Sequence, residues 1–174
     1  DGFVSRGLGD VYKRQAISSN SSATGDNSIA IGVDSVANQQ NAQSFGVSAT
    51  AAGVNAVAIA AGSFANGSNS MAMGVLANAT ALNTAAIGTF ARATQNGALA
   101  FGANSSAIAN YTMAFGVNAL ASSNNAIAIG RYANATGNVS IALGMFASAN
   151  NNDTFAAGAY AQAIGTNALS LIHI

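Results

Sequence analysis

The chain has 174 residues, of which 51% are hydrophobic and only 6% are charged, with five Lys or Arg against five Asp or Glu. It contains one histidine and no cysteine. So few ionisable groups argue against acid–base, nucleophilic and metal chemistry, because each needs titratable or ligand side chains held close together. The basic footprint that nucleic acid requires is missing as well. We therefore expect no enzyme activity, no cofactor, no metal site and no nucleic-acid partner.

The two ends of the chain are related through their coding DNA. Residues 10–15 (DVYKRQ) can be encoded by GATGTGTATAAGAGACAG, and the reverse complement of that DNA encodes residues 169–174 (LSLIHI). This DNA resembles the transposon end used in preparing sequencing libraries, and residues 5–9 match translation of the adapter that precedes it. We therefore expect residues 1–15 and 169–174 to be translated adapter, and the native segment to be a fragment covering residues 16–168.

The native segment is almost without charge. Within residues 16–168, two arginines stand against three aspartates, a formal net charge of −1, and no histidine, lysine or glutamate remains. Its longest apolar run, residues 56–61, is far below the roughly 20 residues that a membrane helix needs. We expect no direct membrane insertion by this segment.

A period of fourteen residues runs through the native segment. One small-apolar-Ala-apolar-Gly pattern recurs ten times, with Ala60 in place of glycine in one copy, and an alanine follows five residues after each of these positions. Such self-similarity is the signature of a solenoid, in which each repeat forms one coil. The repeat glycines are Gly32, Gly46, Gly74, Gly88, Gly102, Gly116, Gly130, Gly144 and Gly158.

Each repeat predicts two short strands and two tight turns. Apolar and small residues alternate before the glycine, as in residues 28–31 and 126–129, and β-branched side chains favour strands there. Asparagine and glycine recur between the strands as turn residues. The fold class is therefore all-β, a parallel β-roll solenoid of about ten fourteen-residue coils.

Strict alternation along a strand also predicts which side chains point inward. We expect the apolar pair on either side of the constant alanine, such as Ile29 and Ile31, to fill the interior, with Gln43 as a defect in that scheme. The alanine between them would face outward against another subunit, because solvent does not demand so small a residue in every coil. These candidate subunit-contact residues are Ala30, Ala58, Ala72, Ala86, Ala100, Ala114, Ala128, Ala142 and Ala156.

The repeats resemble a known family. Residues 27–32 (NSIAIG), 69–74 (NSMAMG) and 125–130 (NAIAIG) are similar to the head repeats of YadA-like trimeric autotransporter adhesins. The resemblance implies a left-handed β-roll, a side-by-side homotrimer and display on the outer membrane of a Gram-negative bacterium as an extracellular head. It further implies an export signal before the segment, and a neck, a stalk and a membrane anchor after it.

The function that the resemblance implies is adhesion, with a role in virulence. We expect a repetitive trimeric surface that attaches the bacterium to host extracellular matrix, to cell-surface proteins or to other bacteria, because many weak contacts add through avidity. An alternative is a structural spacer that displays another adhesive domain. The candidate ligand surface consists of the aromatics in the variable outward positions of the second strand of each coil, Phe90, Tyr132, Phe146 and Tyr160, together with Arg92 and Arg131. The same aromatics could instead pack against a neighbouring chain or coil.

Two other solenoid functions fit less well. Left-handed β-helix acyltransferases resemble hexapeptide repeats with an active-site histidine, whereas the period here is fourteen and the only histidine, His173, lies in the expected adapter. Ice-binding solenoids carry threonine at one position of every coil, and the threonines of this chain move between positions.

Overall fold

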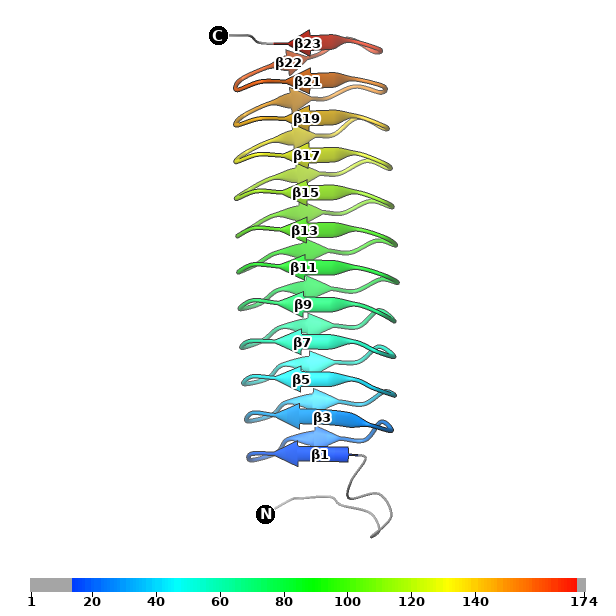
Figure 1. Ribbon diagram of the computed structural model, residues 1–174, viewed down its shortest axis with the longest axis vertical. Helices are drawn as coiled ribbons and strands as arrows, with labels where there is room; N and C mark the ends of the chain where they lie inside the picture. The colour runs from blue at the N-terminus through cyan, green and yellow to red at the C-terminus, as the bar shows by residue number, and fades with distance from the viewer. Residues whose placement is uncertain (1–13, 172–174) are drawn as a thin grey trace.

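The computed structural model describes residues 14–171, which form one straight rod of stacked coils (Figure 1). The long-strand sheet has twelve strands. They are β1 (Arg14–Ile17), β3 (Ser28–Ile31), β5 (Gln43–Phe45), β7 (Val57–Ile59), β9 (Met71–Met73), β11 (Ala85–Ile87), β13 (Leu99–Phe101), β15 (Met113–Phe115), β17 (Ile127–Ile129), β19 (Ile141–Leu143), β21 (Phe155–Ala157) and β23 (Leu169–Leu171).

The short-strand sheet lies behind it and has eleven strands of two residues each. They are β2 (Ser22–Ala23), β4 (Val36–Ala37), β6 (Thr50–Ala51), β8 (Phe64–Ala65), β10 (Asn78–Ala79), β12 (Arg92–Ala93), β14 (Ser106–Ala107), β16 (Leu120–Ala121), β18 (Asn134–Ala135), β20 (Ser148–Ala149) and β22 (Gln162–Ala163). No helix long enough to cross a membrane occurs in residues 14–171.

Every strand pairs in parallel with the strand fourteen residues away, as in the register of Leu99 with Met113 and of Phe101 with Phe115. In Figure 1 the front strands run from right to left while the chain climbs from N to C, so the coil is left-handed. These observations confirm the predicted all-β parallel β-roll. The roll has about eleven turns rather than ten, because residues 14–17 and 169–171, which we assigned largely to the adapter ends, add strands at both ends. The rest of those ends, including His173, lies outside the described residues.

The repeat glycines allow consecutive coils to touch through their backbones. Gly102 has a φ of +133°, and a Cβ built on it would lie 2.6 Å from the carbonyl oxygen of Gly116 in the next coil. Only a residue without a side chain tolerates both conditions. Ala60, in the same position, keeps a positive φ of 99°, below the 116–140° of the repeat glycines, so that turn is reshaped.

The interior of the roll contains only small side chains. Every buried residue in the described chain is glycine, alanine, serine or threonine, and the constant alanines from Ala30 to Ala156 are completely buried within the single chain. Each long strand from β3 to β21 alternates buried small residues with more exposed ones that are mostly larger, as in Ser28, Ile29, Ala30 and Ile31. The two sheets therefore lie so close together that a methyl or hydroxyl group fills the space between them.

The predicted direction of the side chains was therefore wrong. The nine alanines expected to contact another subunit point into the roll and have no exposed surface: Ala30, Ala58, Ala72, Ala86, Ala100, Ala114, Ala128, Ala142 and Ala156. The flanking pairs point outward instead, so Gln43 is not a buried defect but lies half-exposed on the outer face. A small residue in every coil marks a tight interior here, not an intermolecular contact.

Buried hydroxyl groups close the turns at both edges of the interior. Ser105 Oγ donates to the carbonyl oxygen of Gly102 at 2.8 Å, and Thr112 Oγ1 donates to that of Ala109 at 2.7 Å. Ser44, the one exception in the alanine column between residues 16 and 168, donates to the carbonyl oxygen of Ala49 at 3.0 Å. These bonds satisfy donors that would otherwise be buried without a partner.

Gly102→Ala should destabilise the roll by about 3 kcal/mol or more, because the new methyl group meets the next coil and the backbone is left-handed at this position. Urea unfolding followed by circular dichroism measures the change. Gly165→Ala is the matched control, since its Cβ would meet only Ala168 Cβ at 3.8 Å and its φ is not left-handed. Equal losses in the two variants would contradict the backbone-contact explanation.

Ala100→Leu should cost about 3 kcal/mol or more, because the interior has no room for an isobutyl group. Leu99→Ala, one residue earlier and partly exposed, should leave the single coil stack folded. Comparing the unfolding midpoints of the two variants checks which face of the strand lies inside the roll. If Leu99→Ala destabilised the single chain more than Ala100→Leu, the assignment of Ala100 to the interior would be wrong.

Candidate adhesive surface

The outer face of the long-strand sheet is a continuous apolar surface. It is formed by the two side chains that flank the buried alanine of each strand, and Met71, Met113 and Ile129 are each more than one-third exposed in the single chain. Phe101 and Phe115 meet on this face edge to face, with ring centroids 4.8 Å apart. Among the coils of the native segment, Gln43 is the one polar side chain in these positions.

A second surface is the glycine corner, the turn formed by each repeat glycine and the two residues that follow it. We expected the variable residues at the second of these positions to lie on the short strands, but the structure places them in the turn with a positive φ. Tyr132, Phe146 and Tyr160 stack there in consecutive coils, with centroids 4.9 and 5.1 Å apart and planes 3° and 13° from parallel. The rings therefore pack on neighbouring coils, one of the alternatives the sequence left open.

Arg131 completes this aromatic column. Its guanidinium carbon lies 5.5 Å from the centroid of Tyr132 and 5.6 Å from that of Phe146, within the range of cation–π attraction. Its Nη2 also lies 3.5 Å from the sulfur of Met145. The structure thus brings four of the six predicted ligand residues together.

The other two predicted ligand residues stand apart from the column. Phe90 occupies the same corner position, but Asn104 and Asn118 separate it from Tyr132. Arg92 lies on β12, exposed on the outer face of the short-strand sheet, with Asn78 and Ser106 as its register partners. The six residues are therefore not one site.

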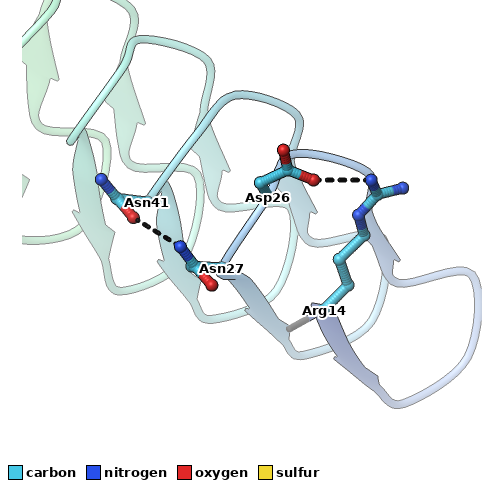
Figure 2. A network of polar contacts seen from close by, with 4 residues as sticks. All are labelled: Arg14, Asp26, Asn27 and Asn41. Carbon is cyan, nitrogen blue, oxygen red and sulfur yellow. Dashed lines mark hydrogen bonds and ion pairs between the residues drawn. The ribbon is translucent and has the colours of Figure 1, made fainter. Parts of the chain in front are cut away.

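The opposite edge of the roll is the asparagine corner, the turn before each long strand. Its asparagines adopt a φ of 55–58°, as turn residues should. Their side chains form a ladder in which each Nδ2 donates to the Oδ1 fourteen residues later, over 2.9–3.3 Å (Figure 2 shows its first step). The ladder contains Asn27, Asn41, Asn55, Asn69 and Asn83. Beside it, Arg14 pairs with Asp26 at 2.7 Å (Figure 2).

The ladder ends where the corner changes composition. The next two positions are Gly97 and Tyr111, and a Cβ on Gly97 would lie only 2.7 Å from Cδ1 of Tyr111. The tyrosine ring therefore leans back over the glycine and fills the space that an asparagine side chain would need. Tyr111 is 66% exposed and is the largest apolar interruption of this corner.

A straight rod of near-identical coils, with its variable side chains in columns on the outside, defines a β-roll display module. The model of the YadA head domain repeat matches the chain at residues 20–42, 44–59, 65–91, 79–105, 107–133 and 121–147. The solved collagen-binding domain of the Yersinia adhesin YadA superposes with a TM-score of 0.60 at 29% identity, covering 92% of this chain and 82% of that one. None of the curated protein sequences compared with the chain matches it.

The chain belongs to the YadA head family, and it is a segment of an adhesin head. Such heads are surface-exposed parts of bacterial proteins, and the family as a class acts by binding. The resemblance read from the repeats is thereby confirmed.

Sequence reasoning missed three features of this surface: the apolar outer face, the asparagine ladder and the contacts of Arg131 with Met145 and two aromatic rings. The ladder could have been predicted, because asparagine recurs at five positions spaced fourteen residues apart, which places five amides in line. The outer face could also have been predicted, since large and variable side chains suit an open surface better than a narrow interior. Nothing in the sequence indicated that Arg131 would lie over two rings.

The double variant Gly97→Asn/Tyr111→Asn should extend the ladder without a break from Asn83 to Asn125. Three new amide hydrogen bonds at the surface should add about 1–2 kcal/mol to the free energy of unfolding. Gly97→Asn alone should add nothing, because Tyr111 occupies the space. A double-mutant cycle measured by urea unfolding gives the coupling. Strictly additive single effects would contradict the ladder as a cooperative row.

Proposed function

We propose that this segment works as a homotrimer joined through the outer face of the long-strand sheet, and that the trimer attaches a Gram-negative bacterium to the extracellular matrix or a cell-surface protein of its host. The observation that carries the proposal is the apolar face itself, which runs along every coil of the repeat region. An apolar surface of that extent is characteristic of an interaction site. Membership of the YadA head family supports three copies.

The matrix part of the proposal is supported by the solved relative, the collagen-binding domain of the Yersinia adhesin YadA. A trimeric rod presents each outward side chain three times at every level and repeats related side chains along its length. Contacts that are weak singly then combine through effective concentration. This mode of binding needs no deep pocket and suits an almost uncharged surface.

Light scattering and a solid-phase assay on collagen-coated and albumin-coated wells test both parts together. The particle in solution should have three times the mass of one chain, which is 17.0 kDa. Leu99→Asn/Phe101→Asn places two amides on the apolar face and should yield a folded monomer, since neither side chain is needed inside the roll. Its retention on collagen should fall at least about tenfold, because avidity is lost.

The outcomes of this assay separate the two parts. A monomeric wild-type chain would contradict the trimer. A trimer that stays on neither collagen nor other matrix-coated wells would contradict adhesion and leave the role of a spacer that carries another adhesive domain.

A further inference from the structure

The glycine corner is mostly apolar from Val33 to Tyr160. The residue after each repeat glycine is mostly valine or alanine. The next position is large and apolar in half of the coils and is Asp34, Ser48, Gly62, Asn104 or Asn118 in the others. The exposed apolar members of the corner are Val33, Val47, Val75, Leu76, Phe90, Val117, Tyr132 and Tyr160. Asp34 and Arg131 are the only charged residues in these two columns, so covering the corner would remove little charge from water.

The aromatic column occupies strained backbone. Tyr132, Phe146 and Tyr160 have φ values of 60°, 58° and 63°, a region that disfavours large side chains. Equivalent turns hold Asp34, Asn104 and Asn118, residue types that adopt this conformation readily. Three successive rings at positions better suited to asparagine form one stacked apolar column, whereas Tyr111, at a similar φ on the other corner, stands alone.

The two corners differ in character. The asparagine corner carries the amide ladder, which already satisfies its own polar groups, and it remains polar apart from interruptions such as Leu82, Tyr111 and Val139. The glycine corner continues directly from the apolar face, because only the repeat glycine separates the last side chain of each long strand from the exposed residue beyond it. Apolar surface therefore extends around one edge of the roll to a much greater degree than around the other.

We infer that the glycine corner is a second contact between copies, so that Tyr132, Phe146 and Tyr160 pack against the neighbouring chain of the trimer. The inference rests on the trimeric part of the proposed function. A second copy fits better than a ligand because exposed apolar residues recur along the corner from Val33 to Tyr160, as a contact between parallel rods does. A ligand would require only a local patch.

This assignment relocates the surface available to a host molecule. Arg131, held over two rings of its own chain, then lies in the seam between chains and supports the packing. The adhesive surface becomes the asparagine corner together with the outer face of the short-strand sheet. Of the six residues predicted to bind ligand, Arg92 alone stays on that surface.

Tyrosine nitration with tetranitromethane tests the seam, with Tyr111 as an internal control. In the single chain Tyr111, Tyr132 and Tyr160 are 66%, 45% and 57% exposed. In the assembled trimer, Tyr132 and Tyr160 should react at least about tenfold more slowly than Tyr111, because the core of an interface excludes solvent. Tryptic cleavage after Arg92 and Arg131 separates the control tyrosine from the other two, and fragment mass spectrometry resolves that pair. In the monomeric Leu99→Asn/Phe101→Asn variant all three should react at similar rates.

A pair of matched variants gives an independent measurement. Phe146→Asn and Tyr111→Asn each replace an aromatic residue at positive φ with a residue that suits that backbone, so both should fold. Dilution in the analytical ultracentrifuge should show at least about a tenfold weaker trimer for Phe146→Asn and no change for Tyr111→Asn. If Tyr111, Tyr132 and Tyr160 of the wild-type trimer react alike, or if the two variants dissociate alike, the seam is overturned while the trimer stands. A monomeric wild-type chain overturns both.

Discussion

The narrowness of the roll is the constraint from which the other features follow. Two sheets separated by no more than methyl and hydroxyl groups leave the coil without a conventional core of large side chains. The burial of apolar area, which is the usual driving force, is therefore small within one chain, and the backbone ladders and the turn geometry contribute a larger share of the coil's stability. The repeat glycine belongs to the same constraint, since it lets one coil lie against the next through the main chain.

The period was enough to predict the architecture, because a fixed fourteen-residue repeat with turn residues at constant positions admits few arrangements besides stacked coils. The direction of the side chains was not predictable by the same reasoning. Alternation identifies two faces of a strand, but which face lies inside depends on the thickness of the coil, and thickness is set by the geometry of the turns. The signal that Ala30 and its equivalents lie inside was their constancy, and we had attributed that constancy to contact with another chain. Gln43 illustrates the consequence, since a residue that looked misplaced inside is unremarkable outside.

The surface was predictable only in part for a related reason. Exposure of Phe90, Tyr132 and Tyr160 followed from their variability between coils. The stacking of Tyr132, Phe146 and Tyr160, and the position of Arg131 over two of these rings, depend on the conformation of one turn. Sequence spacing places these residues in one column, but it does not show that the column lies in a left-handed turn rather than on a strand.

The register has a consequence for how such a rod changes over generations. Each of the pairings in both sheets joins residues that are fourteen positions apart, as Ala86 with Ala100 and Ala93 with Ala107. Deleting or duplicating a whole repeat therefore reconnects two equivalent positions, and it shortens or lengthens the rod by one step of roughly 4.8 Å without altering any remaining coil. Unequal recombination between the related DNA segments that encode the coils would thus adjust the reach of the rod in fixed increments, while the outward columns diversify independently.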